Sequence, residues 1–377
     1  MATRIAVTRE QRPGETRVAA TPDTVRKLAA SGFALTVETG AGAHASISDQ
    51  DYRDAGAEIA PSAEAALQSA DVLLKVRGPS DAELQALRAG TIVVGLLDPH
   101  QDRPLIDALA QKQATAFAME FVPRITRAQA MDALSSQANL SGYRAVIEAA
   151  AAYGRVMPMM MTAAGTVAPA KVFVMGAGVA GLQAIATARR LGAVVTATDV
   201  RPAAKEQVES LGAKFIAVED EEFKAAETAA GYAREMSPEY QAKQAALMAE
   251  HIRKQDIVIT TALIPGRKAP RLVSAAHVAS MRQGSVVVDL AVEQGGNVEG
   301  SRPGEVADVG GVRLVGLTNL PGRIAADASA LYARNLMAFA ALLLNGQGEL
   351  EPDYQDDILK GALVTRDGAV VHPALAR

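Results

Sequence analysis

A glycine-rich turn between two strand-like runs constrains the fold of this chain more than any other feature. Residues 171–175 form a short apolar run, and residues 176–181 follow with the spacing G-x-G-x-x-G. A helical pattern then leads to a second run, 194–198, which ends in Asp199. This order of elements predicts a dinucleotide-binding βαβ unit: a strand, a glycine turn, a helix and a second strand that ends in an acid.

Each glycine of the turn has a physical reason. Gly176 permits the tight turn, Gly178 lets backbone amides approach a pyrophosphate, and Gly181 lets the helix pack against the strand. The first helical turn offers unpaired N–H groups to the phosphates, so we expect backbone contacts from Val179 and Ala180 as well. A glycine turn without a ligand is the simpler alternative, and the presence of every part in register disfavours it.

Asp199 bears on which dinucleotide binds. A carboxylate at this strand end accepts hydrogen bonds from the ribose hydroxyls and repels a 2′-phosphate, so the sequence favours NAD(H) over NADP(H). Val200 follows, and Arg201 brings a cation that in principle pairs with a phosphate. We give Asp199 more weight because it ends the strand, and we predict that all three residues bracket the adenosine ribose.

Composition excludes several classes of function. A chain of 377 residues is too long for one core, so two domains are expected. Cysteine is absent and the five histidines are scattered, so we predict neither disulfides nor a metal site. A net charge of −4 without a basic block argues against nucleic-acid binding. No apolar run approaches the roughly 20 residues of a membrane span, and no signal peptide is expected.

Strand-like and helical segments alternate along the rest of the chain, which predicts parallel sheets with helices on both faces. Over the first 130 residues the strand-like runs are 5–7, 35–38, 72–76, 91–96 and 114–117, and the helical runs are 22–31, 63–69, 80–88 and 103–112. Beyond the glycine turn the strand-like runs are 215–218, 257–261, 285–290 and 313–316. A helical pattern at 136–155 precedes the turn, and another at 325–344 follows the last strand.

We therefore predict an α/β fold with two Rossmann-like domains, each a doubly wound parallel sheet, separated by a cleft. The first domain takes residues 1–135 plus 320–377, because the last helical run returns to it. The second domain, 136–319, carries the glycine turn and binds the nucleotide. The tail of the chain has alternating apolar positions around Asp367 and Gly368, which predicts a short hairpin.

The segment near 219–237 does not fit a compact Rossmann unit. It is too long for an ordinary connection, and loops of this length are usually functional lids or disordered. Gly231 suits a mobile flap that closes over the nucleotide. A solvated acidic excursion explains the composition equally well, so both interpretations stay open.

Several longer segments resemble one family. They are TREQRPGETRVAATP (8–22), MEFVPRITRAQAMDALSSQANLSGYRAV (119–146), MMMTAAGTVAPAKVFVMGAGVAGLQAIATARRLGA (159–193), ATDVR (197–201), AGYAREM (230–236), TTALIPGRKAP (260–270), DLAVEQGGN (289–297) and VTRDGAVVHPAL (364–375). The segment PRITRAQAMDALSSQ is the most discriminating. Over essentially its whole length the chain resembles the NAD(H)-binding component, domain I, of proton-translocating nicotinamide nucleotide transhydrogenase. Alanine dehydrogenase is a related family.

The resemblance implies an oxidoreductase that is active only with partner subunits. In that family, hydride passes directly from NADH on this component to NADP⁺ on another, with Si-to-Re face specificity, and a membrane-spanning component couples the transfer to proton translocation. The resemblance also implies a homodimer in the cytoplasm, peripheral on the inner face of the cell membrane. The helix at 136–155 and the tail hairpin are possible dimer contacts.

The resemblance further assigns the nicotinamide end of the site. Hydride transfer between two rings needs no acid or base from the protein, only reacting carbons held about 3–3.5 Å apart. Candidate catalytic residues by resemblance are Arg124 for the carboxamide, Gln129 at the partner interface, and Asp132 and Ser135 for the ribose or ring amide. Further nucleotide-binding residues by resemblance are Ile125, Thr126, Arg127, Ala130, Met131 and Leu263.

Simpler structural roles compete with two of these assignments. The polar residues of 124–135 also suit an ordinary helix N-terminus, with Thr126 as its N-cap. Leu263 follows a predicted strand end, where open α/β sheets bind ligands, but a turn at Pro265 and Gly266 explains the same residues.

Alanine dehydrogenase is the main alternative, and it needs a general acid or base that transhydrogenase does not. The histidine of that family aligns with Leu97, which cannot transfer protons, and an aspartate of that family aligns with Glu293. Arg17 and Lys75 remain in positions that resemble the amino-acid-binding pair. His100 substitutes for the missing histidine only if the local alignment shifts, and its surroundings predict an exposed turn.

A third interpretation is a module that only binds or senses NAD. It overlaps with the first one, because a transhydrogenase component holds a single nucleotide and forms half of an active site. A test with the partner component separates the two interpretations.

Overall fold

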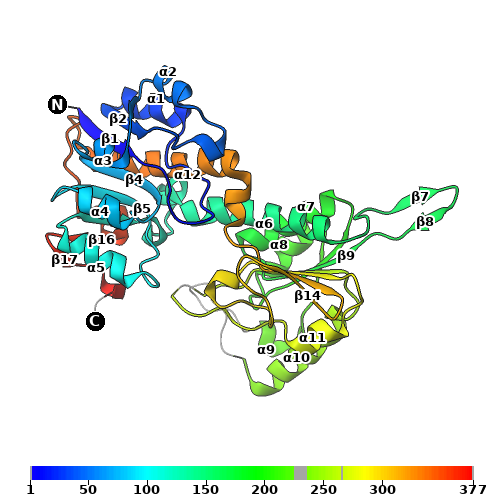
Figure 1. The fold of residues 1–377 in the computed structure, drawn as a ribbon. Coiled ribbons are helices and arrows are strands. Elements are labelled where there is room, and N and C mark those ends of the chain that lie inside the picture. The colour runs from blue at the N-terminus through cyan, green and yellow to red at the C-terminus, as the bar shows by residue number, and fades with distance from the viewer. Residues whose placement is uncertain (1, 225–235, 265, 376–377) are drawn as a thin grey trace. The chain divides into compact units, whose positions relative to one another are not determined.

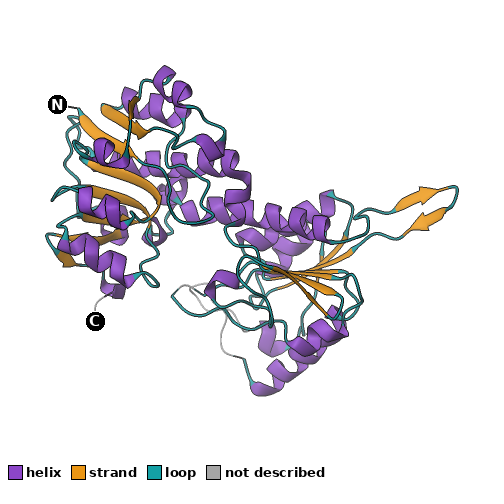
Figure 2. Ribbon diagram, viewed as in Figure 1, coloured by secondary structure: helices purple, strands orange, loops and turns teal. Residues whose placement is uncertain are grey.

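The computed structural model describes residues 2–224, 236–264 and 266–375. The chain divides into two compact units, Met1–Gln137 with Pro321–Arg377, and Ala138–Leu320 (Figure 1). Each unit has its own sheet with helices packed on it (Figure 2). Gly231 and most of the predicted flap lie outside the described residues.

The first unit contains an eight-stranded sheet of order β17-β16-β6-β5-β4-β1-β2-β3. Its strands are β1 (Thr3–Val7), β2 (Phe33–Glu38), β3 (Glu58–Ala60), β4 (Val72–Arg77), β5 (Ile92–Leu96), β6 (Thr115–Ala118), β16 (Leu363–Arg366) and β17 (Ala369–Val370). Six strands pair in parallel, as the βα alternation predicted. The tail hairpin adds β16 and β17 as two antiparallel strands at one edge.

Helices cover both faces of this sheet. They are α1 (Pro22–Ala30), α2 (Asp49–Asp54), α3 (Ala63–Leu67), α4 (Asp81–Ala86), α5 (Arg103–Gln111), α12 (Ala325–Ala340) and α13 (Asp357–Ala362). Because successive strand residues point to opposite faces, Ile5 and Val7 lie in one core cluster and Ala6 in another. Phe339 of α12 belongs to the first cluster and Ile106 of α5 to the second.

The second unit contains a seven-stranded sheet of order β11-β10-β9-β12-β13-β15-β14. Its strands are β9 (Lys171–Met175), β10 (Val194–Thr198), β11 (Lys214–Phe215), β12 (Ile257–Thr260), β13 (Val286–Asp289), β14 (Val306–Val309) and β15 (Val312–Val315). All neighbours are parallel except β14, an edge strand that the sequence pattern did not predict. The chain leaves β9 for β10 on one side and reaches β12 on the other, so the topological switch point lies between β9 and β12.

The helices of this unit place the glycine turn. They are α6 (Ala133–Ala152), which begins in the first unit, α7 (Val179–Arg190), α8 (Ala204–Ser210), α9 (Glu221–Lys224), α10 (Pro238–Ile252) and α11 (Ala275–Ser280). Val172 and Val174 share a core cluster with residues of α6 and α7, while Phe173 and Met175 share another with α10 and α11. Both faces of the parallel strands are therefore buried, as expected for a Rossmann unit.

One element extends away from the seven-stranded sheet of its unit. Strands β7 (Met160–Thr162) and β8 (Gly165–Val167) form a separate two-stranded antiparallel hairpin, and all six residues are exposed (Figure 1). We call residues 156–170, which include this hairpin, the arm. The strand predictions from the sequence did not include it.

Candidate nucleotide-binding site

The glycine turn has the geometry that its spacing predicted. Gly176 adopts a φ of +108°, and a Cβ there would collide with the Thr261 hydroxyl. A Cβ on Gly181 would collide with the carbonyl oxygen of Gly176, so the helix sits directly on the turn. Gly178, the N-cap of α7, faces open space, with nothing within 4 Å of its hypothetical Cβ. The turn is thus closed on the protein side and open where a phosphate would approach.

A further glycine supports the turn from the α6 side. A Cβ on Gly142 would collide with the carbonyl oxygen of Ala180, so α6 packs backbone to backbone against the first turn of α7. This contact holds the amide-bearing end of α7 in place. The sequence pattern did not single out Gly142, because the approach of two helices distant in the chain leaves no local signal.

The carboxylate of Asp199 links the turn to the end of β10. It accepts from the backbone N–H of Ala177 at 2.7 Å and from the N–H of Arg201 at 2.9 Å. The Arg201 guanidinium also donates to it, from Nε at 2.9 Å and Nη2 at 3.1 Å. The side chain of Val200, between them, is 69% exposed. The acid is therefore at the predicted strand end but already paired.

The carboxyl end of β12 borders the same turn. Thr261 donates its hydroxyl to the carbonyl of Gly176 at 3.1 Å, and Leu263 is 46% exposed beyond it. Asn297, which is fully buried, holds this segment through its side chain, accepting from the N–H of Ala262 at 3.1 Å and donating to its carbonyl at 2.9 Å. Sequence reasoning missed Asn297, although it ends the family-like segment DLAVEQGGN.

Residues 124–135 lie in the first unit. Asp132 accepts from the N–H and the hydroxyl of Ser135 at 2.8 and 2.6 Å, which caps the start of α6. This cap explains why α6 begins at Ala133, three residues before the predicted start. The segment before it is a 3-10 helix (η3, Thr126–Met131). The alternative of Thr126 as an N-cap is not supported, because η3 is preceded by Ile125 and no side chain caps it.

The other residues of this segment differ in exposure. Arg124 and Gln129 are exposed, and within the described parts of the chain no hydrogen bond engages either side chain. Arg127 pairs with Asp356 at 2.7 Å. Ile125, Thr126 and Ala130 are also exposed. The side chain of Met131, however, is 6% exposed and packs in the hydrophobic core, so only its backbone is available to a ligand.

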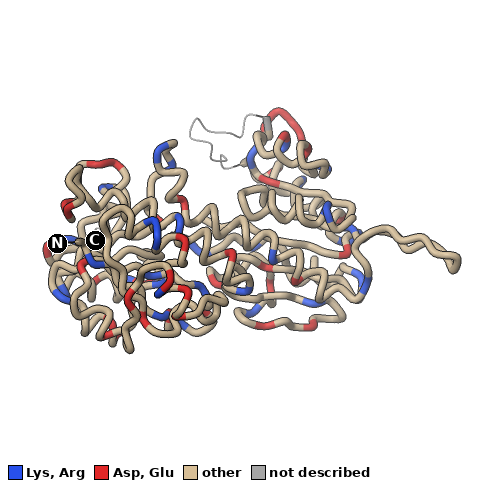
Figure 3. Tube along the Cα trace, turned by 90° about the horizontal axis from the view of Figure 1, so that it is seen from above, with Lys and Arg blue, Asp and Glu red and all other residues tan. Residues whose placement is uncertain are grey.

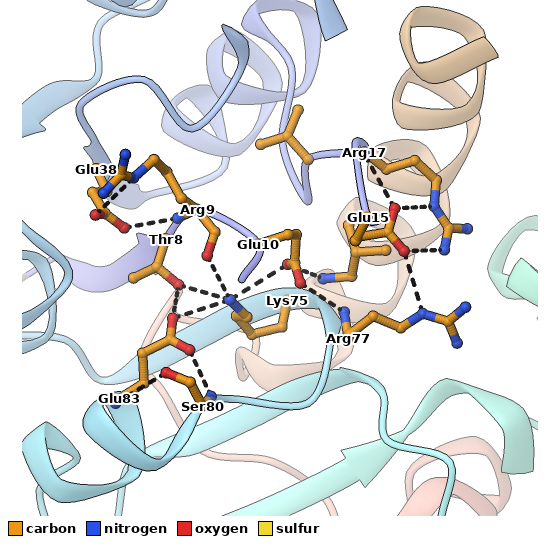
Figure 4. Close-up of polar contacts among 12 residues, drawn as sticks. Thr8, Arg9, Glu10, Glu15, Arg17, Glu38, Lys75, Arg77, Ser80 and Glu83 are labelled. Carbon is orange, nitrogen blue, oxygen red and sulfur yellow. Dashed lines mark hydrogen bonds and ion pairs between the residues drawn. The ribbon is translucent and has the colours of Figure 1, made fainter. Parts of the chain in front are cut away.

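A buried charge cluster occupies the first unit (Figure 4). Arg17, 3% exposed, donates Nε and Nη2 to Glu15 at 2.8 and 2.7 Å and Nη1 to Gln137 at 2.8 Å. Arg77 adds a third contact to Glu15, at 3.3 Å. Burial alone would raise the pKa of Glu15, but the hydrogen bonds and charge of Arg17 outweigh it and lower that pKa to about 2. The guanidinium of Arg17 is thus committed to internal partners.

Lys75 is equally committed. Its side chain is 1% exposed, and its Nζ donates to Thr8 at 3.1 Å, to the carbonyl of Arg9 at 3.0 Å and to Glu83 at 3.0 Å, with Glu10 at 3.5 Å (Figure 4). An ammonium has three N–H donors, so these contacts use all of them. The two residues predicted to resemble an amino-acid-binding pair are therefore held by acids of the chain itself.

Leu97 and His100, the two positions considered for the histidine of alanine dehydrogenase, both lie in the first unit. Leu97 is 1% exposed and lines a cavity of about 500 Å³, whose other lining residues include both leucines, such as Leu105, and charged side chains, such as Arg12 and Asp102. His100 lies on an exposed turn and packs edge-on against Phe121, at 5.2 Å between ring centroids. The side chain at position 97 is thus buried and cannot transfer protons.

Two further classes of site find no support. Across residues 2–224, 236–264 and 266–375, no helix combines the length and apolarity that crossing a membrane requires. Within those same ranges, no cluster of three or more His, Cys, Asp or Glu side chains is arranged to hold a metal ion.

Comparison with known proteins finds relatives in two groups, transhydrogenases and alanine dehydrogenases. The family description alanine dehydrogenase/PNT matches with its N-terminal domain at residues 6–141 and its C-terminal domain at 145–373. An NAD(P) transhydrogenase subunit alpha chain of Rhodospirillum rubrum is 53% identical, covering 99% of this chain and 98% of that protein. Alanine dehydrogenase of Mycolicibacterium smegmatis is 31% identical, covering 99% and 96%.

Solved structures agree with these relatives. The transhydrogenase from Sinorhizobium meliloti matches with a TM-score of 0.89 at 57% identity, over 98% of this chain and 100% of that one. An L-alanine dehydrogenase matches with a TM-score of 0.84 at 29% identity, over 99% and 98%. Both comparisons confirm the predicted α/β fold with Rossmann-like domains.

Proposed function

The chain belongs to the alanine dehydrogenase/PNT family, and on that premise we propose that it is the NAD(H)-binding subunit of a proton-translocating transhydrogenase. In this proposal, hydride passes from NADH on this chain to NADP⁺ on a partner component, with Si-to-Re face specificity. The observation that carries the choice is the buried side chain of Leu97, which cannot transfer protons and which by resemblance stands where alanine dehydrogenase has its histidine.

The glycine turn fits the pyrophosphate of NAD(H). Gly178 leaves open space in front of the first N–H groups of α7, including those of Val179 and Ala180. Asp199, Val200 and Arg201 are proposed to bracket the adenosine ribose. The nicotinamide ring supplies the hydride when the cofactor is bound, and the chain contributes binding and orientation.

Residues of the first unit are proposed for the nicotinamide end. Arg124 and Gln129 are exposed and available to a ligand or a partner, which supports roles for them in hydride transfer. Asp132 and Ser135 are assigned by resemblance as well, but their side chains already bind each other. We expect them to act by fixing the start of α6. Leu263 is proposed to cover the nucleotide from the end of β12, where it is exposed.

A homodimer is part of the proposal, and the arm supports it. Residues 156–170 contain no charged side chain, and Met159, Met160 and Met161 are 60%, 44% and 77% exposed (Figure 3). Both outer edges of the hairpin also lack a strand partner within the described residues. An isolated two-stranded hairpin is marginal in water, and exposed edges are usually protected by charge. We propose that a second copy of the chain covers the arm.

The remaining partners are proposed from the relatives. A relative named as a subunit alpha chain implies further subunits, and we propose a separate NADP(H)-binding component and a membrane-spanning proton channel. The chain would then be cytoplasmic and peripheral on the inner face of the cell membrane.

Two activity assays test this function. One offers NAD⁺ with L-alanine, or NADH with pyruvate and ammonia; the other offers NADH and an NADP analogue with an isolated NADP(H)-binding component. We expect no turnover in the first assay and transfer in the second only when the partner is present. Alanine turnover would reject the proposal, and binding of NADH without transfer to any partner would favour a sensing module.

A further inference from the structure

The hydrogen bonds of Asp199 leave little room for another donor. Its two oxygens receive four N–H groups: the backbone amides of Ala177 and Arg201, and Nε and Nη2 of the Arg201 side chain. A carboxylate has about four lone-pair sites, so this set saturates it. The backbone bond between residues 199 and 201 is local, because an aspartate often accepts from the amide two residues on.

The same contacts occupy the Nε–Nη2 edge of the Arg201 guanidinium. Nε and Nη2 form the fork that Arg presents to carboxylates and phosphates, and both face Asp199. Nη2 lies 3.3 Å from the carbonyl of Ala177 as well. The Asp199 side chain is only 7% exposed and that of Arg201 is 36% exposed, so water screens the pair incompletely.

We propose that this ion pair, rather than the carboxylate alone, sets the preference for NAD(H) over NADP(H). Arg201 is a latent ligand for a 2′-phosphate that Asp199 holds in a closed pair. The inference rests on the proposed nucleotide site and deepens it, because it names the residue that determines its specificity.

The two cofactors meet this pair differently. The ribose of NAD(H) brings a hydroxyl, which can replace one N–H donor on Asp199 while the rest of the pair stays formed. A 2′-phosphate brings no donor in its ionised form and carries negative charge, so it competes with Asp199 for the fork. A 2′-phosphate that takes the Nε–Nη2 edge therefore has to break the pair, and it leaves the carboxylate beside the phosphate.

A double-mutant cycle tests this mechanism. Dissociation constants for NADH and NADPH are measured on the full chain with Asp199→Asn, Arg201→Ala and both together. Asn keeps an oxygen for the Ala177 amide but releases the guanidinium, so we expect NADPH to bind about tenfold to a hundredfold more tightly relative to NADH. In the Arg201→Ala background the same Asn substitution should give little of this gain.

The outcomes separate this inference from the proposed function. The latent-ligand mechanism is rejected if Asp199→Asn improves NADPH binding relative to NADH equally with and without Arg201. It is also rejected if the substitution gives no improvement at all. Both outcomes require that the wild-type chain binds NADH. If the wild-type chain binds neither nucleotide, the proposed function fails and the inference with it. Asp199→Ala serves as a second variant if the Asn variant does not fold.

Arg190→Ala is the matched control. Arg190 is an exposed arginine in the last turn of α7, the end of the helix opposite the glycine turn. The Arg190→Ala substitution removes one positive charge from the unit that also contains Arg201. Its ratio of NADPH to NADH affinity should equal that of the wild type, and a change in that ratio would assign the effect to net charge instead.

Discussion

The glycines of the glycine turn are constrained for different physical reasons. A Cβ on Gly181 collides with a backbone oxygen of the turn, whereas a Cβ on Gly178 meets nothing in the protein. We expect Gly181→Ala to lower the free energy of unfolding by about 1–3 kcal/mol, as overpacking does, and to weaken NADH binding. Thermal denaturation and NADH titration measure the two effects.

Gly178→Ala is the matched variant for this prediction. Its methyl group points into the space proposed for the pyrophosphate, so NADH affinity should fall while the melting temperature stays near wild type. Unchanged NADH affinity in the Gly178→Ala variant would show that the open side of the turn is not a ligand site.

Glu120 is a buried acid with a consequence for stability. Burial raises its pKa to about 7. The carboxylate accepts hydrogen bonds from the backbone N–H groups of Asp98 at 2.7 Å and Leu97 at 3.2 Å, which lower the pKa but do not outweigh burial. The unfolded value is near 4.5, so the folded chain binds the extra proton between pH 4.5 and 7. The free energy of unfolding should therefore fall as pH rises through this window, by on the order of 3 kcal/mol.

Glu120→Gln removes this titration. Relative to wild type, the variant should gain stability as pH rises from 5 to 8 in denaturant unfolding curves. Glu64→Gln, on the exposed surface of α3, should follow the wild-type pH dependence. A parallel pH dependence of Glu120→Gln and wild type would contradict the raised pKa.

Residue roles differed in how far they could be predicted. Gly176, Gly178 and Gly181 could be assigned because their constraint is local: the turn and its two neighbouring elements are contiguous in the chain. The pairing of Asp199 with Arg201 could not, since a strand-end acid and a nearby arginine allow several geometries. The burial of the Met131 side chain in the core could not be predicted either, because family-like spacing does not report it, and its binding role stays a prediction for the backbone alone.

Among the elements, the arm has the composition of an interface. Its exposed methionines and uncharged strands suit burial against another apolar surface. We expect replacement of Met159, Met160 and Met161 by Thr to convert the proposed dimer to a monomer at micromolar concentration, with the fold retained. Light scattering coupled to size exclusion measures the mass, and circular dichroism checks the fold.

Val306→Thr is the control for the arm. Val306 is 54% exposed on the edge strand β14, so this substitution also replaces an exposed apolar side chain in a strand of the same unit. It should leave the mass unchanged. A monomeric wild type, or a dimer that survives the triple substitution, would reject the arm as the dimer contact.

Elements with strong periodicity could be predicted, and those without it could not. The buried runs that became β4, β5 and β13 are rich in Val, Ile and Leu, interrupted only by Lys75 and Gly95 within 72–76 and 92–96, and such composition is the signature of strands covered on both faces. The arm and β14 lack such a pattern because neither packs both faces in a core. The tail hairpin could be predicted from Asp367 and Gly368, both with positive φ, but its pairing to β6 depends on contacts more than 240 residues apart.

On the scale of the whole molecule, the chain shares its fold with alanine dehydrogenases, and we propose a different reaction for it. Both nucleotide binding and the sheet of the first unit are compatible with either activity. The proposal depends on a few side chains: Leu97, which by resemblance stands where those enzymes carry a histidine, and Arg17 and Lys75, which are bound to internal acids. Family membership alone therefore does not decide the reaction, and the proposed difference depends on the contacts of these residues.

These contacts predict the result of an attempted conversion. Leu97→His supplies an imidazole at the position where the related family carries its histidine, but Glu15, Glu10 and Glu83 still hold Arg17 and Lys75. We expect this variant to show no NAD⁺-dependent oxidation of L-alanine above wild type, while its NADH affinity stays within about twofold because the glycine turn lies in the other unit. An alanine dehydrogenase assayed in parallel confirms that the assay detects turnover. Measurable alanine oxidation by the variant would show that the charge cluster opens to admit substrate, and the proposed separation of the two activities would then rest on the missing histidine alone.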